Sequence, residues 1–364
     1  MAEISLILSS PATGSAATTV AVSEGGMGVG VIPSQAIATL LTMRDQIVQM
    51  MAGAPRMSPS DLQLFARSMG KLLFCDDIGL TVSNATQPPL ITKIIATTQE
   101  LKAIPWEYAA LPGVDPPQLT NSVVRLIPEF RAAPPAPLPR NGDFRILLLS
   151  ASPQNFERIP WPDIRDRLLR VFAAALPDLE VIADGEKPQT SKFLRIVNAA
   201  TQTVVRRNIR DDDPHIVHFV GHGTDRGIAL IDGQSNRAVL MNGTAFGAAL
   251  QAAASCRLVI LSACDVANPQ TIDPVNETIG TFAEQVVRNA VPAIIASQTV
   301  INDGTIATFC EGLYPELLSS GSIDLAMAAG RCNVAAQLGT AANAAIEWGI
   351  PVLYRRLCAA KNFA

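Results

Sequence analysis

The chain has 364 residues, 48% of them hydrophobic, with 28 basic against 32 acidic residues. The charge balance lacks the positive surplus that binds a phosphate backbone, so nucleic acid is not an expected partner. No run of ~18 apolar residues could span a membrane, and the first residues lack the basic start of a signal peptide, so we expect no membrane partner. Six scattered cysteines without a C-x-x-C pair disfavour zinc and a disulfide framework, so we expect a soluble cytoplasmic protein with no metal and no other cofactor.

The first part of the chain predicts short strands and amphipathic helices. The expected strands are Glu3 to Leu8, Thr19 to Val22, Pro89 to Ala96 and the apolar run Val123 to Ile127, and the expected helices are Pro33 to Met51 and Ser58 to Leu73. Ser58 and Asp61 are spaced like a capping box. Four prolines within residues 134–139 then stiffen the backbone. We expect an N-terminal α+β subdomain over 1–132, packing on the rest, and a linker over 133–142.

Residues 143–364 show a regular alternation of strands and helices. The expected strands are Phe144 to Ser150, Leu179 to Ala183, Ile216 to Val220, Leu258 to Leu261 and Ala293 to Ser297; the expected helices are Pro162 to Ala175, Ser191 to Arg207, Gly243 to Ala254 and Thr278 to Asn289. Continuous apolar strands separated by helices predict an α/β domain whose mainly parallel sheet has helices on both faces. Binding and catalysis in such sheets occur at the carboxyl ends of the strands.

Two of these strands end in residues that carry chemistry. The sequence HIVHFVGHG at 215–223 runs from a strand into His222, which lies between two glycines, and LVILSACD at 258–265 runs from another strand into Cys264. Adjacent parallel strands lie about 4.8 Å apart, so their ends can bring a thiol and an imidazole to one substrate carbonyl. The imidazole would raise the thiolate fraction or protonate the leaving amine. The backbone amides of Gly223 and Cys264 are candidates for an oxyanion hole.

Simpler interpretations exist for each residue. Cys264 alone fits a small buried hydrophobe, and His222 alone fits a turn cap. We expect His215 and His218 to be structural, satisfied by backbone carbonyls in or beside the strand. The alternative is a metal-dependent hydrolase that uses His215, His218 and His222. A β-branched, apolar stretch without a nearby acidic residue disfavours that alternative.

Two further segments, VPAIIASQTVIND at 291–303 and GLYPELLSSGSIDLAMAAGR at 312–331, follow HFVGHG at 218–223 and LVILSAC at 258–264. Together they resemble the CHAT family of caspase-related cysteine peptidases, over roughly Phe144 to Arg331. The segment PLITKIIATTQELKAIPWE at 89–107 is similar to a proline-tryptophan-glutamate element of that family. The resemblance then extends from about residue 70 and makes the upstream part an integral subdomain.

The resemblance implies a caspase-like fold and a peptidase that cuts a protein substrate. His222 matches the catalytic histidine, Cys264 the nucleophile and Gly223 an oxyanion donor. It also implies that the specificity pocket is built partly from Gln298 to Asp303. A carboxylate at Asp303 would select arginine or lysine, although Asp303-Gly304 also fits a turn or a helix cap.

The chain departs from the family pattern after the cysteine, where it reads Cys264-Asp265-Val266. Asp265 is a further candidate for substrate binding. The segment Asp265 to Asn276 is long enough to mask the site until an activating protein orders it. The resemblance implies a role in bacterial stress, cell-death or antiphage signalling. The rival hypothesis is a catalytically inactive caspase-like scaffold that binds proteins.

Overall fold

The computed structural model describes residues 2–9, 16–23, 26–51, 59–75, 78, 90–111, 121–128, 138–139, 143–224, 226–263, 281–299, 301–338 and 344–357. The elements before the linker are β1 (Ala2–Ser9), β2 (Ala16–Ser23), β3 (Gly26–Pro33), α1 (Ser34–Met51), α2 (Pro59–Leu73), β4 (Leu90–Ala96), α4 (Gln99–Ala103), the 3-10 helix η1 (Trp106–Tyr108) and β5 (Asn121–Pro128). The strands and helices expected here are present, and β3 is an additional strand. Ser58, half of the expected capping box, lies outside the described residues.

After the linker the elements alternate as expected, with several additions. They are β6 (Arg145–Ala151), α5 (Trp161–Ala175), β7 (Glu180–Ala183), β8 (Phe193–Val197), α6 (Gln202–Asp212), β9 (Ile216–Gly221), β10 (Gly223–Thr224), β11 (Gly227–Ile231), β12 (Ala238–Met241), α7 (Gly243–Leu250), β13 (Leu258–Ser262), α8 (Phe282–Asn289), β14 (Ala293–Ser297), α9 (Asp303–Ser320), α10 (Ile323–Leu338), α11 (Ala344–Glu347) and β15 (Pro351–Leu357).

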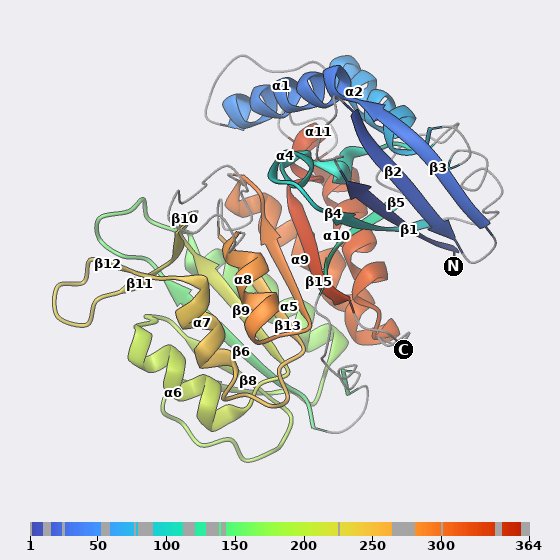
Figure 1. The fold of residues 1–364 in the computed structure, drawn as a ribbon. Helices are drawn as coiled ribbons and strands as arrows, with labels where there is room; N and C mark the ends of the chain where they lie inside the picture. The colour runs from blue at the N-terminus through green and yellow to red at the C-terminus, as the bar shows by residue number, and fades with distance from the viewer. Residues whose placement is uncertain are drawn as a thin grey trace.

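A 12-stranded sheet runs through both parts of the chain in the order β3-β2-β1-β4-β5-β15-β14-β13-β9-β6-β8-β7. The pairs β1–β2, β2–β3 and β14–β15 are antiparallel, and the other pairings described within this sheet are parallel. The strands β10, β11 and β12 form a separate small sheet. Figure 1 shows β1 to β3 with α1 and α2 at one end of the molecule, and β6, β9 and β13 with α6 and α7 at the other.

Helices cover both faces of the sheet after the linker. Alternate residues of a strand face opposite sides: Leu147 and Phe219 lie in a core with residues of α6, α7 and α8, whereas Leu148 and Val220 lie in a core with residues of α5, α9 and α10. The expected α/β fold, a mainly parallel sheet with helices on both faces, is confirmed.

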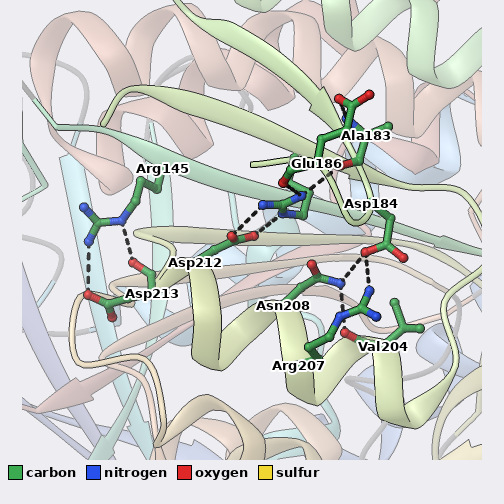
Figure 2. A network of polar contacts seen from close by, with 10 residues as sticks. Arg145, Ala183, Asp184, Glu186, Val204, Arg207, Asn208, Asp212 and Asp213 are labelled. Carbon is green, nitrogen blue, oxygen red and sulfur yellow. Dashed lines mark hydrogen bonds and ion pairs between the residues drawn. The ribbon is translucent and has the colours of Figure 1, made fainter. Parts of the chain in front are cut away.

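The helix expected over Ser191 to Arg207 is wrong in its first half, because β8 occupies Phe193–Val197 and α6 begins only at Gln202. Arg195 interrupts the apolar run of β8, so the sequence pattern of this strand resembles that of an amphipathic helix. Its charge is buried against Asp212, which accepts from Arg195 Nη2 at 2.9 Å, and Nη1 donates to the carbonyls of Ala183 and Glu186 (Figure 2). Asp212, 17 residues later in the sequence, thus neutralises Arg195 and makes a charged residue compatible with a buried strand.

Asp213 aligns the amino-terminal ends of three central strands. Its carboxylate accepts from Arg145 Nη2 (3.0 Å) at the start of β6 (Figure 2). It also accepts from the backbone N–H (2.8 Å) and hydroxyl (2.6 Å) of Ser255 before β13. The residue itself, with φ of 45°, ends α6 and leads into β9. Fixing these three starting points fixes the level at which the opposite, carboxyl ends of β6, β9 and β13 lie.

The parts before and after the linker meet where β5 pairs with β15. Beside this junction Arg125 forms a buried ion pair with Glu107, at 2.6 Å between Nη2 and Oε2 and 2.8 Å between Nε and Oε1. Glu107 belongs to the proline-tryptophan-glutamate element singled out in the sequence. Division of the chain at 133–142 stays a prediction. None of the helices in the described part of the chain could span a lipid bilayer.

Candidate active site

The two strands that lead to the candidate catalytic residues are neighbours. Parallel strands β9 and β13 pair in a register that sets Val220 opposite Ser262. In the sequence His222 follows Val220 by two residues, and Cys264 follows Ser262 by two residues. Cys264 and Asp265 lie outside the described residues, as does the segment to Asn276. The described register therefore brings the two strand ends to the same edge of the sheet.

His222 is half-buried and fixed by residues 156 and 157. Its Nε2 lies 2.6 Å from the backbone carbonyl of Glu157, and its ring stacks on Phe156 with centroids 4.8 Å apart and an angle of 29°. A carbonyl can only accept a hydrogen bond, so Nε2 carries a proton. In the neutral imidazole, Nδ1 is then the basic nitrogen that can take a proton from another group.

Sequence reasoning missed Phe156 and Glu157. They lie in the loop between β6 and α5, which is bonded to the β11–β12 connection through Gln154 N–H to Asn236 O (3.0 Å) and Ala238 N–H to Asn155 Oδ1 (2.7 Å). Glu157 acts through a backbone carbonyl, which every residue has, so no side-chain pattern announced it. The aromatic residue after Asn155 was the only available signal.

Glycines on both sides of His222 have different structural reasons. A Cβ on Gly221 would lie 2.3 Å from a ring carbon of Phe219, so no larger residue fits there without movement. Gly223 begins β10 opposite Ile228, and the bond from Ala229 N–H to His222 O (2.9 Å) makes Gly223–Ile228 a non-hydrogen-bonded pair. The Gly223 N–H therefore points away from β11 and is not used by that ladder.

Asp303 lies close enough to His222 for their charges to interact. It is the first residue of α9, but the side chain that caps the helix is Asn302, whose Oδ1 accepts from Gly304 N–H at 2.8 Å. The Asp303 carboxyl is half-buried. Its pKa is raised, mainly by burial; the interaction with His222 lowers the pKa in part, and the interaction with Glu157 raises it. Within the described ranges, the Asp303 carboxyl has no hydrogen-bond or ion-pair partner.

Gln298, which follows β14, has both ends of its amide engaged by the protein. Its Oε1 accepts from Arg125 Nη2 at 3.2 Å, and its Nε2 donates to the carbonyl of Gly349 at 3.0 Å. Through Arg125 it is connected to Glu107 of the upstream part. Contact between Gln298 and a substrate stays a prediction.

His218 is fully buried between two side chains. Its Nε2 lies 2.8 Å from Ser262 Oγ on β13, and its Nδ1 lies 2.8 Å from the Tyr314 hydroxyl on α9. These partners replace the backbone carbonyls that the sequence led us to expect. Burial lowers the pKa of His218 to about 3, so the ring is neutral at physiological pH.

The three histidines do not converge on one point. His215 precedes β9, where its Nδ1 accepts from the Arg145 N–H at 3.1 Å, whereas His222 follows the other end of the strand. At about 3.3 Å per residue these ends are roughly 20 Å apart. Burial lowers the pKa of His215 to about 4. In the portion described, no three His, Cys, Asp or Glu side chains are arranged to hold a metal ion.

The sequence over residues 74–355 matches the family model described as the CHAT domain. No curated protein sequence matches the chain at a significant level.

Solved structures give the fold a wider context. The separase chain of the separase–securin complex from Saccharomyces cerevisiae is similar, with 7% identity and a TM-score of 0.53; the match covers 98% of this chain and 30% of that one. The complex of RgpB pro- and mature domains from Porphyromonas gingivalis gives 9% identity and a TM-score of 0.46, covering 82% and 69%. A secreted C11 cysteine protease from Bacteroides thetaiotaomicron gives 14% and 0.31, covering 51% and 56%. The likeness to separase, at this identity, concerns the fold alone.

Proposed function

The chain belongs to the CHAT domain family, and from that premise we propose that it is a cysteine endopeptidase that cuts a protein substrate at few sites. Cys264 is the nucleophile and His222 its proton-transfer partner. The observation that carries this proposal is the register of β9 and β13, in which the residues two positions before His222 and Cys264 are paired. The bond from His222 Nε2 to the Glu157 carbonyl supports it further, since it leaves Nδ1 as the base.

The reaction proceeds through a thioester. Nδ1 of His222 takes the proton of the Cys264 thiol, and the sulfur bonds to the substrate carbonyl carbon while the carbonyl electron pair moves to oxygen. The N–H groups of Gly223 and Cys264 stabilise this oxyanion. As the C–N bond breaks, the imidazolium returns its proton to the leaving amine. Water then hydrolyses the thioester and regenerates the thiol.

Substrates are cut after arginine or lysine. The half-buried Asp303 carboxylate beside His222, without a hydrogen-bond partner among the described residues, supports this choice, because a guanidinium or ammonium would supply the missing donors. Asp265 and Gln298 complete the pocket in this proposal. The cellular role, by family resemblance, is limited proteolysis in bacterial antiphage or cell-death signalling, in which another protein activates the peptidase.

An arginine-containing acyloxymethyl ketone, which alkylates an activated cysteine, tests the dyad. Wild-type protein should be labelled at Cys264, and Cys264→Ala and His222→Ala should both lose the label. Cys75 and Cys332 are half-buried thiols outside the dyad, so Cys75→Ala and Cys332→Ala are the matched controls and should be labelled as the wild type is. Labelling that persists in Cys264→Ala would favour the inactive scaffold.

A further inference from the structure

The buried segment 346–350 contacts the loop that leads into α9. Ile346, Glu347, Trp348 and Ile350 expose 4% of their surface or less. Gln298 donates its backbone N–H to Ile350 O (3.3 Å) and its side-chain Nε2 to Gly349 O (3.0 Å). The beginning of the loop is thus attached to this segment.

Glu347 attaches the other end of the loop. The Thr305 hydroxyl donates to its Oε2. Burial raises the pKa of Glu347, while the Thr305 hydroxyl and the nearby backbone N–H of Asn302 lower it. Glu347 is only 2% exposed. Its carboxylate therefore lies at the first turn of α9, an 18-residue helix whose dipole favours a negative charge at this end.

The two donors lie on either side of Asp303 in the sequence. Asn302 precedes it and Thr305 comes two residues later. Arg167 of α5 also reaches this turn, with Nη1 3.2 Å from the carbonyl of Gly304. Glu347 therefore interacts with residues on both sides of Asp303, one position before it and two positions after it.

We propose that Glu347 is a positioning residue for substrate recognition: it holds the first turn of α9 so that Asp303 faces the basic side chain of the substrate. This inference rests on the proposed function for the substrate's chemistry. Glu347 does not itself touch the substrate. A merely structural role would lower stability without altering the discrimination between a charged and an uncharged substrate side chain.

Hydrogen–deuterium exchange of residues 302–306 tests the positioning role without any substrate. Glu347→Gln removes the charge, Thr305→Val removes the hydroxyl at nearly constant shape, and Thr305→Ser keeps the hydroxyl. Exchange should rise about tenfold in the first two variants and stay near the wild-type rate in the third. Glu316→Gln makes the same chemical change near the other end of α9 and should leave exchange at 302–306 unaltered. Unchanged exchange in Glu347→Gln would overturn the inference, whatever the protein cleaves.

Kinetics on two fluorogenic peptides, with arginine or its uncharged analogue citrulline before the cleaved bond, test the consequence. Glu347→Gln and Thr305→Val should raise KM for the arginine peptide about tenfold, with kcat within about threefold, and should narrow the preference for arginine. Thr305→Ser, which keeps the hydroxyl, should retain the wild-type KM and the wild-type preference for arginine. Faster exchange with an unaltered preference would overturn the link to recognition. If the variants exchange faster but the wild-type protein cleaves both peptides equally well, the positioning role is supported and the proposed specificity is contradicted.

Discussion

The side chains of His218 and Ser262 join β9 to β13, with 2.8 Å between His218 Nε2 and Ser262 Oγ. Ser262 lies two residues before Cys264 in the sequence. On its other side the same imidazole meets the Tyr314 hydroxyl of α9 at 2.8 Å. This buried chain of three side chains connects the strand that leads to His222, the strand that leads to Cys264 and the helix that begins with Asp303.

Ser262→Ala should destabilise the fold by about 1–3 kcal/mol, because it leaves Nε2 of a fully buried imidazole without a partner. Urea unfolding followed by circular dichroism measures the change. Ser319→Ala, an exposed serine on α9, is the control and should shift the free energy of unfolding by no more than about 0.5 kcal/mol. Equal effects of the two substitutions would mean that the His218–Ser262 bond contributes nothing.

Acid should destabilise the protein through His218. Burial lowers its folded pKa to about 3, below the ordinary value of about 6.5, so between these values the unfolded chain binds more protons. The stability that the neutral, buried His218 contributes is fully present above about pH 6.5 and is lost as pH falls toward 3. From pH 7 to pH 5 the free energy of unfolding should fall by about 2 kcal/mol. His218→Gln, which cannot titrate, should show a correspondingly smaller loss over the same interval. An identical loss in both proteins would place the titrating group elsewhere.

Asp212→Ala should cost about 3 kcal/mol or more in the free energy of unfolding, because it strands the Arg195 charge in a site that is 5% exposed. The neighbouring Asp211 pairs with Arg210 on the surface, at 2.8 Å between Nε and Oδ1, where solvent screens the interaction. Asp211→Ala should therefore unfold close to the wild-type urea concentration. If the two alanine variants unfold alike, the buried pair does not stabilise β8.

Asp303→Asn should reduce kcat/KM for the arginine peptide about 100-fold, because the cationic side chain loses its charged partner in a partly desolvated site. The citrulline peptide should be cleaved by the variant nearly as well as by the wild type. An arginine-to-citrulline ratio that survives the substitution would assign basic recognition to another residue.

The apolar strands and the class of fold were predictable because buried parallel strands leave continuous hydrophobic runs in the sequence. Burial of the Arg195 charge was not, since its partner Asp212 belongs to a helix that the sequence pattern began too early. Local patterning carries no information about which distant side chain will neutralise a charge.

At the site, the position of His222 at the end of a strand followed from the sequence alone. Its contact with the Glu157 carbonyl did not, because a backbone group has no residue-specific signature. Likewise the partners of His218, Ser262 and Tyr314, lie 44 and 96 residues away and meet it only when β13 and α9 pack on β9. Asp303 lies close to His222, while its place in a substrate pocket and its pairing with a substrate cation stay predictions.

Mapping of new protein N-termini in a native bacterial lysate tests the peptidase hypothesis most directly, because the lysate also supplies candidate activating proteins. Wild-type protein should generate a small set of new N-termini preceded by arginine or lysine, and neither Cys264→Ala nor His222→Ala should generate them. The same N-termini produced by Cys264→Ala at the wild-type rate would contradict the assignment of Cys264 as the nucleophile.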